Sequence, residues 1–370
     1  MATLTYTQLK SLITSVITSA NLSSATFAES ANNVAGLLDK IGKIYSIDTN
    51  FKADKLARFD GEYLAYGRTI EEWQADLILP QDYDASGDNA MNPDPSTFRP
   101  VFYSYTIGRK KIKQTIKNND LERAVHNVGE LASLTAMLLS RIDDSAIQYK
   151  YGLKREMLAK LAALAISEQT GTTVYGATTA YNVGTILKES STSDVRGIVF
   201  KKKSTTSLTW ANAVAQGYIV PLDLVKTMAI PTTDATGEDF IEQVKKDVEI
   251  AEDYSQGHSL NGNALGASTG LVLILKQGIL PVLDVRTLAG AFHEDKLAIP
   301  ANVVTIPDFG SDANGVFAIL MDARGMALHT SYDAVRENFN GDGDFINYFR
   351  HMEHTATISR NTFVKVYKAG

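Results

Sequence analysis

One stretch decides the fold of this chain, DLERAVHNVGELASLTAMLLSRIDDSAIQYKYGLKREMLAKLAALA, residues 120–165. Its apolar residues recur at spacings of three and four, which predicts one long helix. They are Leu131, Leu134, Leu138, Ile142, Tyr149, Leu153, Met157 and Leu161. Asp120 is placed to cap this helix, and Gly129 predicts a bend or the start of its main part. From about Val128 to Ala165 the helix is roughly 55 Å long. A half-apolar helix of that length is typical of a flat, extended subunit or a coiled coil.

Composition bounds the class of protein. A length of 370 residues with 44% hydrophobic residues predicts two or three globular domains. The absence of cysteine excludes disulfides, thiolate zinc sites and cysteine nucleophiles. A net charge of -6 argues against a dedicated nucleic-acid-binding domain, although a protein that merely surrounds nucleic acid remains compatible with it. No export signal or membrane-spanning run is present, so we expect a cytosolic product.

The N-terminal third predicts an arm followed by a long β-hairpin. Residues 1–30 form a short helix or an arm, and residues 32–46 a helix that needs further contacts. Strand patterns at 67–79 and 98–116 flank the polar segment 81–97, which contains Gly87, Pro93 and Pro95. Opposite charges on the two strands favour their pairing. The acidic residues are Glu71, Glu72 and Asp76, and the basic ones are Arg109, Lys110, Lys111, Lys113 and Lys117.

The remainder predicts a small α/β domain at 258–335 and two closing antiparallel strands. Residues 168–235 give no clear order beyond strand-like runs at 185–188 and 198–202. A helix is expected at about 238–254, with Thr236 and Asp239 approximating a capping box. The α/β domain combines LVLILKQG (271–278) as a buried strand, a helix at 282–292, and strands at 302–306 and 316–321. The closing strands are expected at 355–358 and 363–367.

Two residue patterns resemble metal sites but lack the ligand geometry that a metal ion requires. His351 and His354 flank Glu353, but strand alternation would direct the two imidazoles to opposite faces, which favours a structural role. The segment from Asn340 to Asp344 carries alternate oxygen ligands, yet it lacks the turn glycine and the bidentate glutamate of a calcium loop, so a turn is favoured. We therefore predict no metal site.

Candidate phosphate-binding and catalytic sites are equally weak. The glycines at 262, 266 and 270 lack the GK[ST] ending of a phosphate loop and favour a flexible loop. No serine lies in a G-x-S-x-G elbow. The basic run 109–117 is compatible with phosphate contacts, but Tyr103 and Tyr105 lie upstream of it, which favours salt bridges to a neighbouring chain. No catalytic residue and no cofactor are predicted.

Several segments together resemble one protein family. They are LLDKIGKIYSID (37–48), YGRTIEEWQADL (66–77), the long helix with Gly129 near its start, TGEDFIEQVKKD (236–247), ILPVLDVRTLAGAF (279–292), NVVTIPDF (302–309) and HTATISRNTFVKVY (354–367). Their colinear order is similar to that of the major capsid (head) proteins of short-tailed phages of the phi twenty-nine type. The resemblance covers roughly residues 31–165 and 236–370.

This resemblance implies an α+β, Hong Kong 97-type capsid fold. It places an N-terminal arm at 1–55, an extended E-loop hairpin at 56–118, a P-domain with a long spine helix (about 128–165) at 119–257 and 336–370, and an α/β A-domain at 258–335. Two departures are expected. Residues 168–235 are longer than in the family, and the immunoglobulin-like domain that follows in the phi twenty-nine type is missing.

The implied function is that of a structural major capsid protein, without enzymatic activity, that self-assembles into an icosahedral or prolate head shell around double-stranded DNA. A cellular nanocompartment shell of the encapsulin type, with the same fold, is the alternative. Implied partners are copies of the chain in pentamers and hexamers, a separate scaffolding protein, a portal protein and packaged DNA bound without sequence specificity. The expected location is the virion, after assembly in the host cytoplasm, with no membrane and no cofactor.

Subunit interfaces are then the candidate sites. The hairpin is expected to lie on the adjacent subunit's spine helix, with Ile70, Trp73 and Tyr103 as apolar anchors. Its polar rim is predicted to comprise Glu71, Glu72, Arg109, Lys110 and Lys111. Covalent cross-linking through a hairpin lysine is not expected, because residues 79–97 contain none. The charged face of the long helix is expected to face the capsid interior or a neighbour's hairpin. It carries Arg141, Asp143, Asp144, Lys150 and Lys154.

Overall fold

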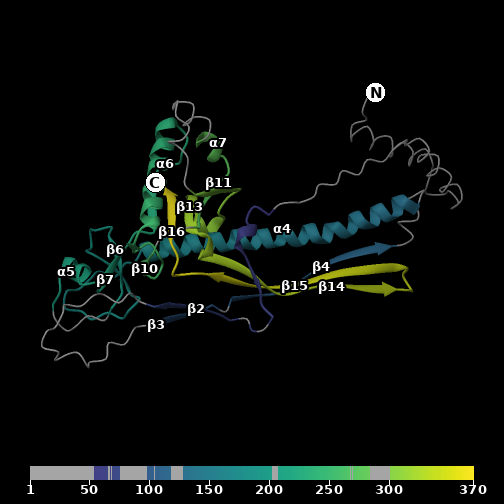
Figure 1. The fold of residues 1–370 in the computed structure, drawn as a ribbon, viewed down its shortest axis with the longest axis horizontal. Coiled ribbons are helices and arrows are strands. Elements are labelled where there is room, and N and C mark those ends of the chain that lie inside the picture. The colour runs from purple at the N-terminus through teal and green to yellow at the C-terminus, as the bar shows by residue number, and fades with distance from the viewer. Residues whose placement is uncertain are drawn as a thin grey trace, which may run out of the picture. The chain divides into compact units, whose positions relative to one another are not determined.

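A computed structural model provides the structure (Figure 1). It describes residues 54–65, 67, 69–75, 98–103, 105–117, 128–201, 207–266, 268, 270–283 and 301–370. All of these belong to one compact unit, residues 51–370. The predictions for the N-terminal 50 residues, for segment 81–97 and for most of the helix at 282–292 lie outside the described residues.

A five-stranded mixed sheet, here called the central sheet, runs in the order β12-β11-β13-β16-β8. Its strands are β8 (Val225–Met228), β11 (Leu271–Lys276), β12 (Asn302–Ile306), β13 (Val316–Asp322) and β16 (Val364–Ala369). The β11 strand is parallel to β12 and antiparallel to β13. Its first five side chains are buried, which confirms the buried strand predicted from LVLILK.

Two helices cover the two faces of the central sheet. Alternate residues of β11 point to opposite faces, so Val272 and Ile274 join one core and Leu273 and Leu275 the other. The first core contains helix α4 (Val128–Gln169), and the second contains helix α6 (Asp234–Glu252). Each fully buried aliphatic side chain contributes about 1.5–3 kcal/mol relative to an exposed one. The two helices therefore hold the sheet from both sides.

The cap of α6 lies three residues earlier than the sequence indicates. Thr233, not Thr236, is the N-cap, and its hydroxyl accepts a hydrogen bond from the Thr236 backbone. The Thr236 hydroxyl in turn accepts one from the backbone N–H of Thr233, at 3.0 Å. This reciprocal pair completes a capping box in which threonine takes the place of the usual glutamate. The helix consequently begins at Asp234, whose charge favours the N-terminal end of the helix dipole.

A second sheet, here called the long sheet, has the order β1-β14-β15-β4. Its strands are β1 (Asp60–Tyr63), β4 (Tyr105–Lys117), β14 (Met326–Asn340) and β15 (Phe345–Ile358). The β14–β15 hairpin closes where Asn340 Oδ1 accepts from the backbone of Asp342 and Gly343, both at 3.1 Å. This confirms a turn at 340–344.

The two predicted closing strands exist, but their mutual pairing is wrong. Residues 355–358 end β15, which pairs with β14 and β4, whereas residues 364–367 lie in β16 of the central sheet. The short segment between them, from Ser359 to Phe363, carries the chain from one sheet to the other. Its length suits a hairpin loop equally well, so local sequence does not distinguish the two arrangements.

Helix α4 is a continuous element of 42 residues that runs alongside the long sheet and on to the central sheet (Figure 1). It continues past Ala165 to Gln169. Residues 118–127 lie outside the described part, so the prediction of a bend or start at Gly129 stays a prediction.

The helix does not leave all its charges exposed. Lys154 is completely buried, and its Nζ lies 2.6 Å from Asp54 Oδ2 and 2.5 Å from Asp60 Oδ1. The expectation that Lys154 faces outward is therefore wrong, because the chain from Asp54 to Asp60 crosses the helix at this point. Leu56 and Phe59 of the same segment enter the first core.

The segment that the sequence leaves unordered contains a three-stranded antiparallel sheet with its own small core. The strands are β5 (Ile186–Lys188), β6 (Arg196–Val199) and β7 (Ile219–Leu222), and helix α5 (Trp210–Ala215) precedes β7. Its core consists of Leu187, Val199, Leu208, Ala213 and Ile219. The predicted strand-like runs at 185–188 and 198–202 overlap β5 and β6.

Replacing Lys154 should destabilise the subunit strongly. Lys154→Ala leaves the nearly buried Asp54 carboxylate without its cation, which costs about 3 kcal/mol of unfolding free energy. Lys160→Ala is the matched control, because its ion pair with Asp312 is exposed at both ends. Urea denaturation of the soluble subunit measures both. Equal midpoints for the two variants would contradict a central role of the buried pair.

A buried histidine sits between α4 and the long sheet. His354 is 1% exposed, and its ring lies 6.1 Å from that of Tyr149. Burial and the charge of Lys150 lower its pKa to about 4, although Asp333 and Asp60 act in the opposite direction. The folded protein therefore favours the neutral form of the His354 imidazole.

Acidification should destabilise the subunit through His354. In the unfolded chain the imidazole takes up its proton near pH 6.5, so its contribution is complete above that pH and is lost as the pH falls towards about 4. The urea midpoint of the wild type should drop between pH 7 and 4.5 more than that of His354→Gln. His351→Gln, at a half-buried position, should keep the wild-type slope. Identical slopes for wild type and His354→Gln would overturn this assignment.

Candidate assembly interface

The predicted hairpin is present as a two-stranded sheet of β2 (Ile70–Ala75) and β3 (Phe98–Tyr103). Ile70 pairs with Tyr103, and Trp73 pairs with Pro100. A two-stranded sheet has little capacity to bury its own side chains. Trp73 is accordingly 65% exposed. The side chain of Tyr103 lies outside the described part of the structure.

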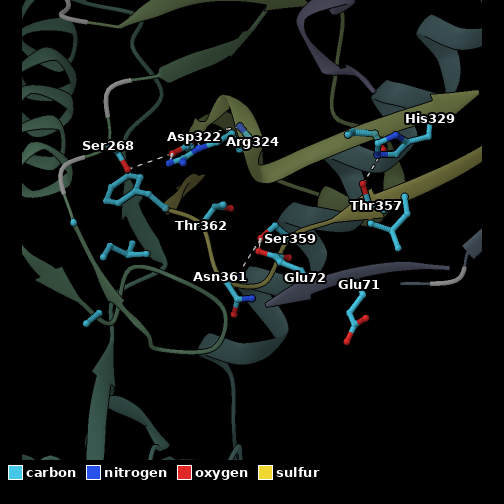
Figure 2. A pocket seen from close by; sticks show the side chains of 16 residues that line it. Glu71, Glu72, Ser268, Asp322, Arg324, His329, Thr357, Ser359, Asn361 and Thr362 are labelled. Atoms are coloured by element: carbon cyan, nitrogen blue, oxygen red, sulfur yellow. Dashed lines mark hydrogen bonds and ion pairs between the residues drawn. The ribbon is translucent and has the colours of Figure 1, made fainter. Parts of the chain in front are cut away.

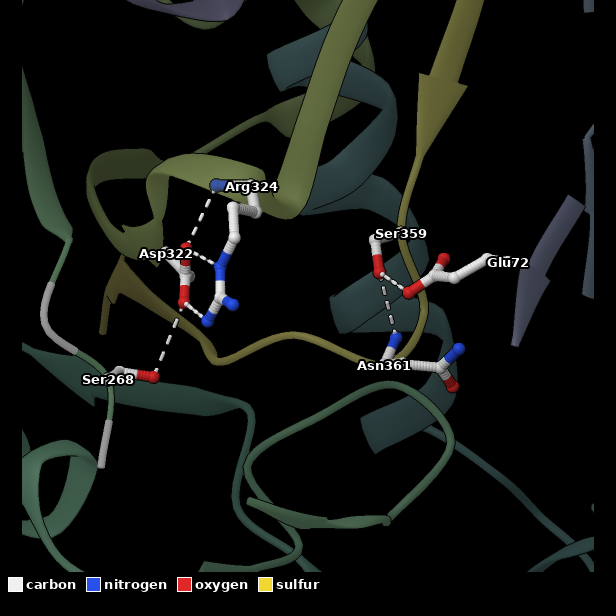
Figure 3. A network of polar contacts seen from close by, with 6 residues as sticks. All are labelled: Glu72, Ser268, Asp322, Arg324, Ser359 and Asn361. Carbon is white, nitrogen blue, oxygen red and sulfur yellow. Dashed lines mark hydrogen bonds and ion pairs between the residues drawn. The ribbon is translucent and has the colours of Figure 1, made fainter. Parts of the chain in front are cut away.

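The hairpin is fixed to the subunit body at its root. The Ser359 hydroxyl donates a hydrogen bond of 2.8 Å to Glu72 Oε1, and the backbone N–H of Asn361 donates one of 3.1 Å to Ser359 Oγ (Figure 3). Because strand side chains alternate, Glu71 points away from this contact while Glu72 points towards it (Figure 2). The bond connects β2 to the segment that carries the chain between the two large sheets.

A pocket of about 460 Å³ opens beside this root (Figure 2). Asp322 lies in it and receives hydrogen bonds from Arg324 and Ser268 (Figure 3). Burial alone would raise the pKa of Asp322, but the hydrogen bonds and charge of Arg324 keep it below its ordinary value. A carboxylate engaged in this way is a structural partner of Arg324 and is poorly suited to act as a general base.

An asparagine network continues the root towards α4. Asn361 Oδ1 accepts from the side-chain amides of Asn261 and Asn263, at 2.8 and 2.6 Å. Arg360 donates to Asn261 Oδ1 at 3.0 Å and to Glu168 of α4 at 2.6 Å. The loop around 258–270, predicted to be flexible, is thereby tied to the helix and the inter-sheet segment. Gly262, at φ 65°, supplies a left-handed residue in this loop.

No group of three or more His, Cys, Asp or Glu side chains within the described ranges is arranged to hold a metal ion. His351 and His354 lie on strand β15 as predicted, and His354 faces Thr330 at 3.4 Å. No helix of the described part is long and apolar enough to cross a membrane.

The predicted pairing of acidic and basic hairpin strands is wrong. Glu71 and Glu72 pair with Phe102 and Val101 of β3, whereas Lys110 and Lys111 belong to β4, which pairs with β15. The reason is that Ile112 and Ile116 of β4 gain burial beneath α4, with Ile116 only 4% exposed, and the hairpin offers no such cover.

Arg109 forms its ion pair with a carboxylate of β15 and not with one of the acidic hairpin strand. Its Nε lies 3.3 Å from Glu353 Oε2, and its guanidinium lies 4.3 Å above the ring of Tyr332. Both partners are more than 220 residues away in sequence. Because of this separation, the sequence does not predict Glu353 and Tyr332 as partners of Arg109. It also does not predict the roles of Ser359 and Asn361, because the sequence SRN (359–361) between two strands has the composition of an ordinary turn.

An apolar groove of about 810 Å³ lies between α4 and the strands β4 and β15. Its lining includes Tyr105, Ile107, Leu153, Met157 and Ile358. Tyr105 is 70% exposed. Lys110, one of the predicted rim residues, also lines this groove. The predicted interface residues thus fall on two surfaces, the hairpin and the β4 edge of the long sheet.

Comparison with known families identifies the chain. The model of the family described as Phi29-like phage major capsid protein matches residues 4–364. The chain belongs to this family. The predicted capsid function is thereby confirmed, and the encapsulin-type alternative has no better support. A comparison with curated proteins gave no match.

Solved structures agree in fold. A chain in the capsid structure of Staphylococcus phage Andhra is similar over 89% of this chain and 87% of its own length, with TM-score 0.58 and 11% identity. A chain in the structure of the head fiber and inner core protein gp22 of native bacteriophage P68 gives the same coverage and TM-score at 12% identity. A chain in the capsid structure of Cyanophage P-SCSP1u covers 91% of its length and 89% of this chain, with TM-score 0.51 and 7% identity. The Hong Kong 97-type α+β fold is confirmed.

Removing the root contact should loosen the hairpin of this capsid protein. Ser359→Ala deletes a hydrogen bond to a charged group, and such bonds contribute about 1.5–3 kcal/mol. Amide hydrogen exchange in β2 should accelerate by about tenfold or more, while amides of β16 keep their rates. Glu72→Gln retains an acceptor oxygen but loses the charge, so its exchange rates in β2 should lie between those of the wild type and Ser359→Ala. Unchanged exchange in Ser359→Ala would show that other contacts hold the hairpin.

Proposed function

We propose that this capsid protein builds a phage head through contacts in which the hairpin of one copy lies on the body of the next. The observation that carries this proposal is the exposed hairpin itself. Trp73, at 65% exposure, lies in a sheet of two strands that a hydrogen bond from Ser359 to Glu72 joins to the body. In this proposal a neighbouring copy covers the exposed part of this side chain.

The receiving surface in this proposal is the α4–β4 side of the adjacent copy. Its groove is lined largely by apolar side chains and is bordered by Lys110, Glu156 and Lys160. Trp73 is the apolar anchor, while Ile70, which pairs with Tyr103 in the β-ladder, lies on the same strand face as Glu72 and lines the pocket at the root. Glu71 and Lys110 form the polar rim of this contact, whereas strand alternation places Arg109 and Lys111 on the other face of β4. Glu72 is instead a root residue, because Ser359 of its own chain occupies one of its oxygens.

The parts of the subunit take the roles that the family fold gives them in this proposal. Residues 1–55 form the N-terminal arm, residues 56–118 the E-loop, residues 258–335 the A-domain, and residues 119–257 with 336–370 the P-domain. Helix α4 acts as the spine helix. The strand β4 belongs by pairing to the long sheet, so within the described residues β2 and β3 are the E-loop strands that lie outside that sheet.

The proposed role is purely structural. Copies assemble as pentamers and hexamers in the host cytoplasm around a separate scaffolding protein, with a portal protein at one vertex. Double-stranded DNA then fills the shell without sequence-specific contacts. In the pocket that opens at the hairpin root, the carboxylate of Asp322 is held by Arg324 and Ser268, which supports a structural role for that pocket.

Trp73→Ala should block assembly without unfolding the subunit. Its side chain is mostly exposed, so the melting temperature should stay unchanged, whereas loss of an interface anchor costs about 2 kcal/mol or more per contact. Electron microscopy and sedimentation of the chain co-expressed with the phage's other head proteins measure the yield of shells, which we expect to fall by at least about tenfold. Ile230→Ala, at a site 41% exposed on another surface, is the control. Wild-type chains that remain monomeric under these conditions would overturn the proposed function.

A further inference from the structure

The long sheet has a basic face on the side turned away from α4. Strand alternation places Lys111, Lys113 and Lys117 on one side of β4 and the buried Ile116 on the other. Arg350 marks the α4 side, because it binds Asp143 of the helix. All three lysines are exposed. The cations therefore form a row on the outer side of an edge strand.

Neighbouring strands extend this face with arginine and aromatic side chains. Phe349 of β15 lies opposite Lys113, whose ammonium is 5.8 Å from the ring centroid, and it stacks on His351. Arg336 of β14 lies opposite Phe349 and reaches Tyr332 at 3.5 Å. We call this surface the basic sheet face. It comprises Arg109, Lys111, Lys113, Lys117 and Arg336.

Among the residues that the structure describes, the basic sheet face carries little compensating negative charge. Among the described residues of β4, β14 and β15 on this side, Glu353 is the one carboxylate, and it is paired with Arg109. No ion pair within the described residues engages Lys111, Lys113, Lys117 or Arg336 with a carboxylate. Like charges on neighbouring positions repel each other, and an anionic partner on this face lowers that repulsion.

The same chain contains a segment of opposite charge. Residues 76–97, here called the acidic segment, connect the two hairpin strands and contain no lysine, arginine or histidine. Their charged residues are Asp76, Asp82, Asp84, Asp88 and Asp94. The part of the chain that joins β2 to β3 thus carries five carboxylates, and the basic sheet face carries four cations besides Arg109, which Glu353 already pairs.

We propose that the acidic segment of one copy docks on the basic sheet face of a neighbouring copy. This inference rests on the proposed function and names the electrostatic contact that orients the hairpin on its neighbour. The charged edge of β4 would by itself only prevent unwanted strand pairing. Its match to an acidic segment carried on an exposed hairpin favours a second copy over duplex DNA, and the net charge of -6 points the same way.

Charge reversal with compensation tests the contact. Lys111→Glu with Lys113→Glu should leave the melting temperature unchanged, since both side chains are exposed, and lower the assembly rate by about tenfold or more at low salt. Adding Asp84→Lys and Asp88→Lys to the same chain should restore assembly. Lys226→Glu, exposed on the edge strand β8, is the matched control and should assemble normally.

Cysteine pairs distinguish a neighbour from the same chain, because the wild type contains no cysteine. Asp84→Cys with Thr115→Cys, the latter exposed between Lys113 and Lys117, should give covalent ladders of chains on oxidation. Asp84→Cys with Thr227→Cys should give none. A cross-link confined to single chains would overturn the proposal.

Two further outcomes separate this proposal from its alternatives. Reversed-face variants that assemble normally but retain less duplex DNA would overturn it in favour of a DNA-facing surface. If the wild type forms shells but the compensated variant does not assemble, the proposed charge contact is wrong. The proposed capsid function is unaffected by that result. Failure of the wild type to assemble would instead contradict the proposed function.

Discussion

Burial of one apolar stripe on helix α4 is the interaction on which the rest of the subunit depends. Met157, Leu158 and Leu161 lie in the same core as the central sheet's Ile274 and the long sheet's Leu328. One helix is thus the shared wall of two sheets that do not pair with each other. At 42 residues and about 1.5 Å per residue, the helix reaches about 63 Å, which neither sheet alone would cover.

The orientation of everything attached to this core is set by a few polar contacts. Lys154 fixes the segment from Asp54 to Asp60 across the helix, and Arg360 fixes the inter-sheet segment to Glu168. A buried or half-buried ion pair contributes modestly to stability, but it penalises every alternative register in which one charge remains unpaired. These pairs therefore fix the positions of the segments they join. The hydrogen bond from Ser359 to Glu72 then orients the hairpin relative to the inter-sheet segment.

Sequence periodicity recovered the elements whose amphipathicity is local. The stripe of α4, the apolar run of β11 and the helix α6 were all predictable because each pattern reflects burial on one or both faces. Partners were not predictable in this way. Lys154 has the composition of a solvent-exposed helix residue, and its buried state depends on Asp54, 100 residues earlier.

Pairing between strands failed for the same reason. Charge complementarity in the sequence favours pairing of the basic strand β4 with the nearby acidic strand, whereas its real neighbour β15 begins more than 220 residues later. Strands β15 and β16 were joined because Ser359–Phe363 has the length of a hairpin loop. The capsid fold itself was inferred from a family resemblance in colinear segments, and the physical patterns alone gave only a long helix, a hairpin and a small α/β unit.

The proposed charge pairing also constrains the symmetry of assembly. Two acidic segments repel each other, and so do two basic sheet faces, so a face-to-face dimer that joins like surfaces is disfavoured. Reciprocal two-fold contacts and head-to-tail contacts both bring the acidic segment of one copy to the basic face of another. The head-to-tail contacts are heterologous and close into rings when the rotation permits, and pentamers and hexamers are rings of this kind. Placing opposite charges on separate surfaces of one chain thereby disfavours contacts between like surfaces, and a chain of modest net charge achieves this without a large repulsion between whole subunits.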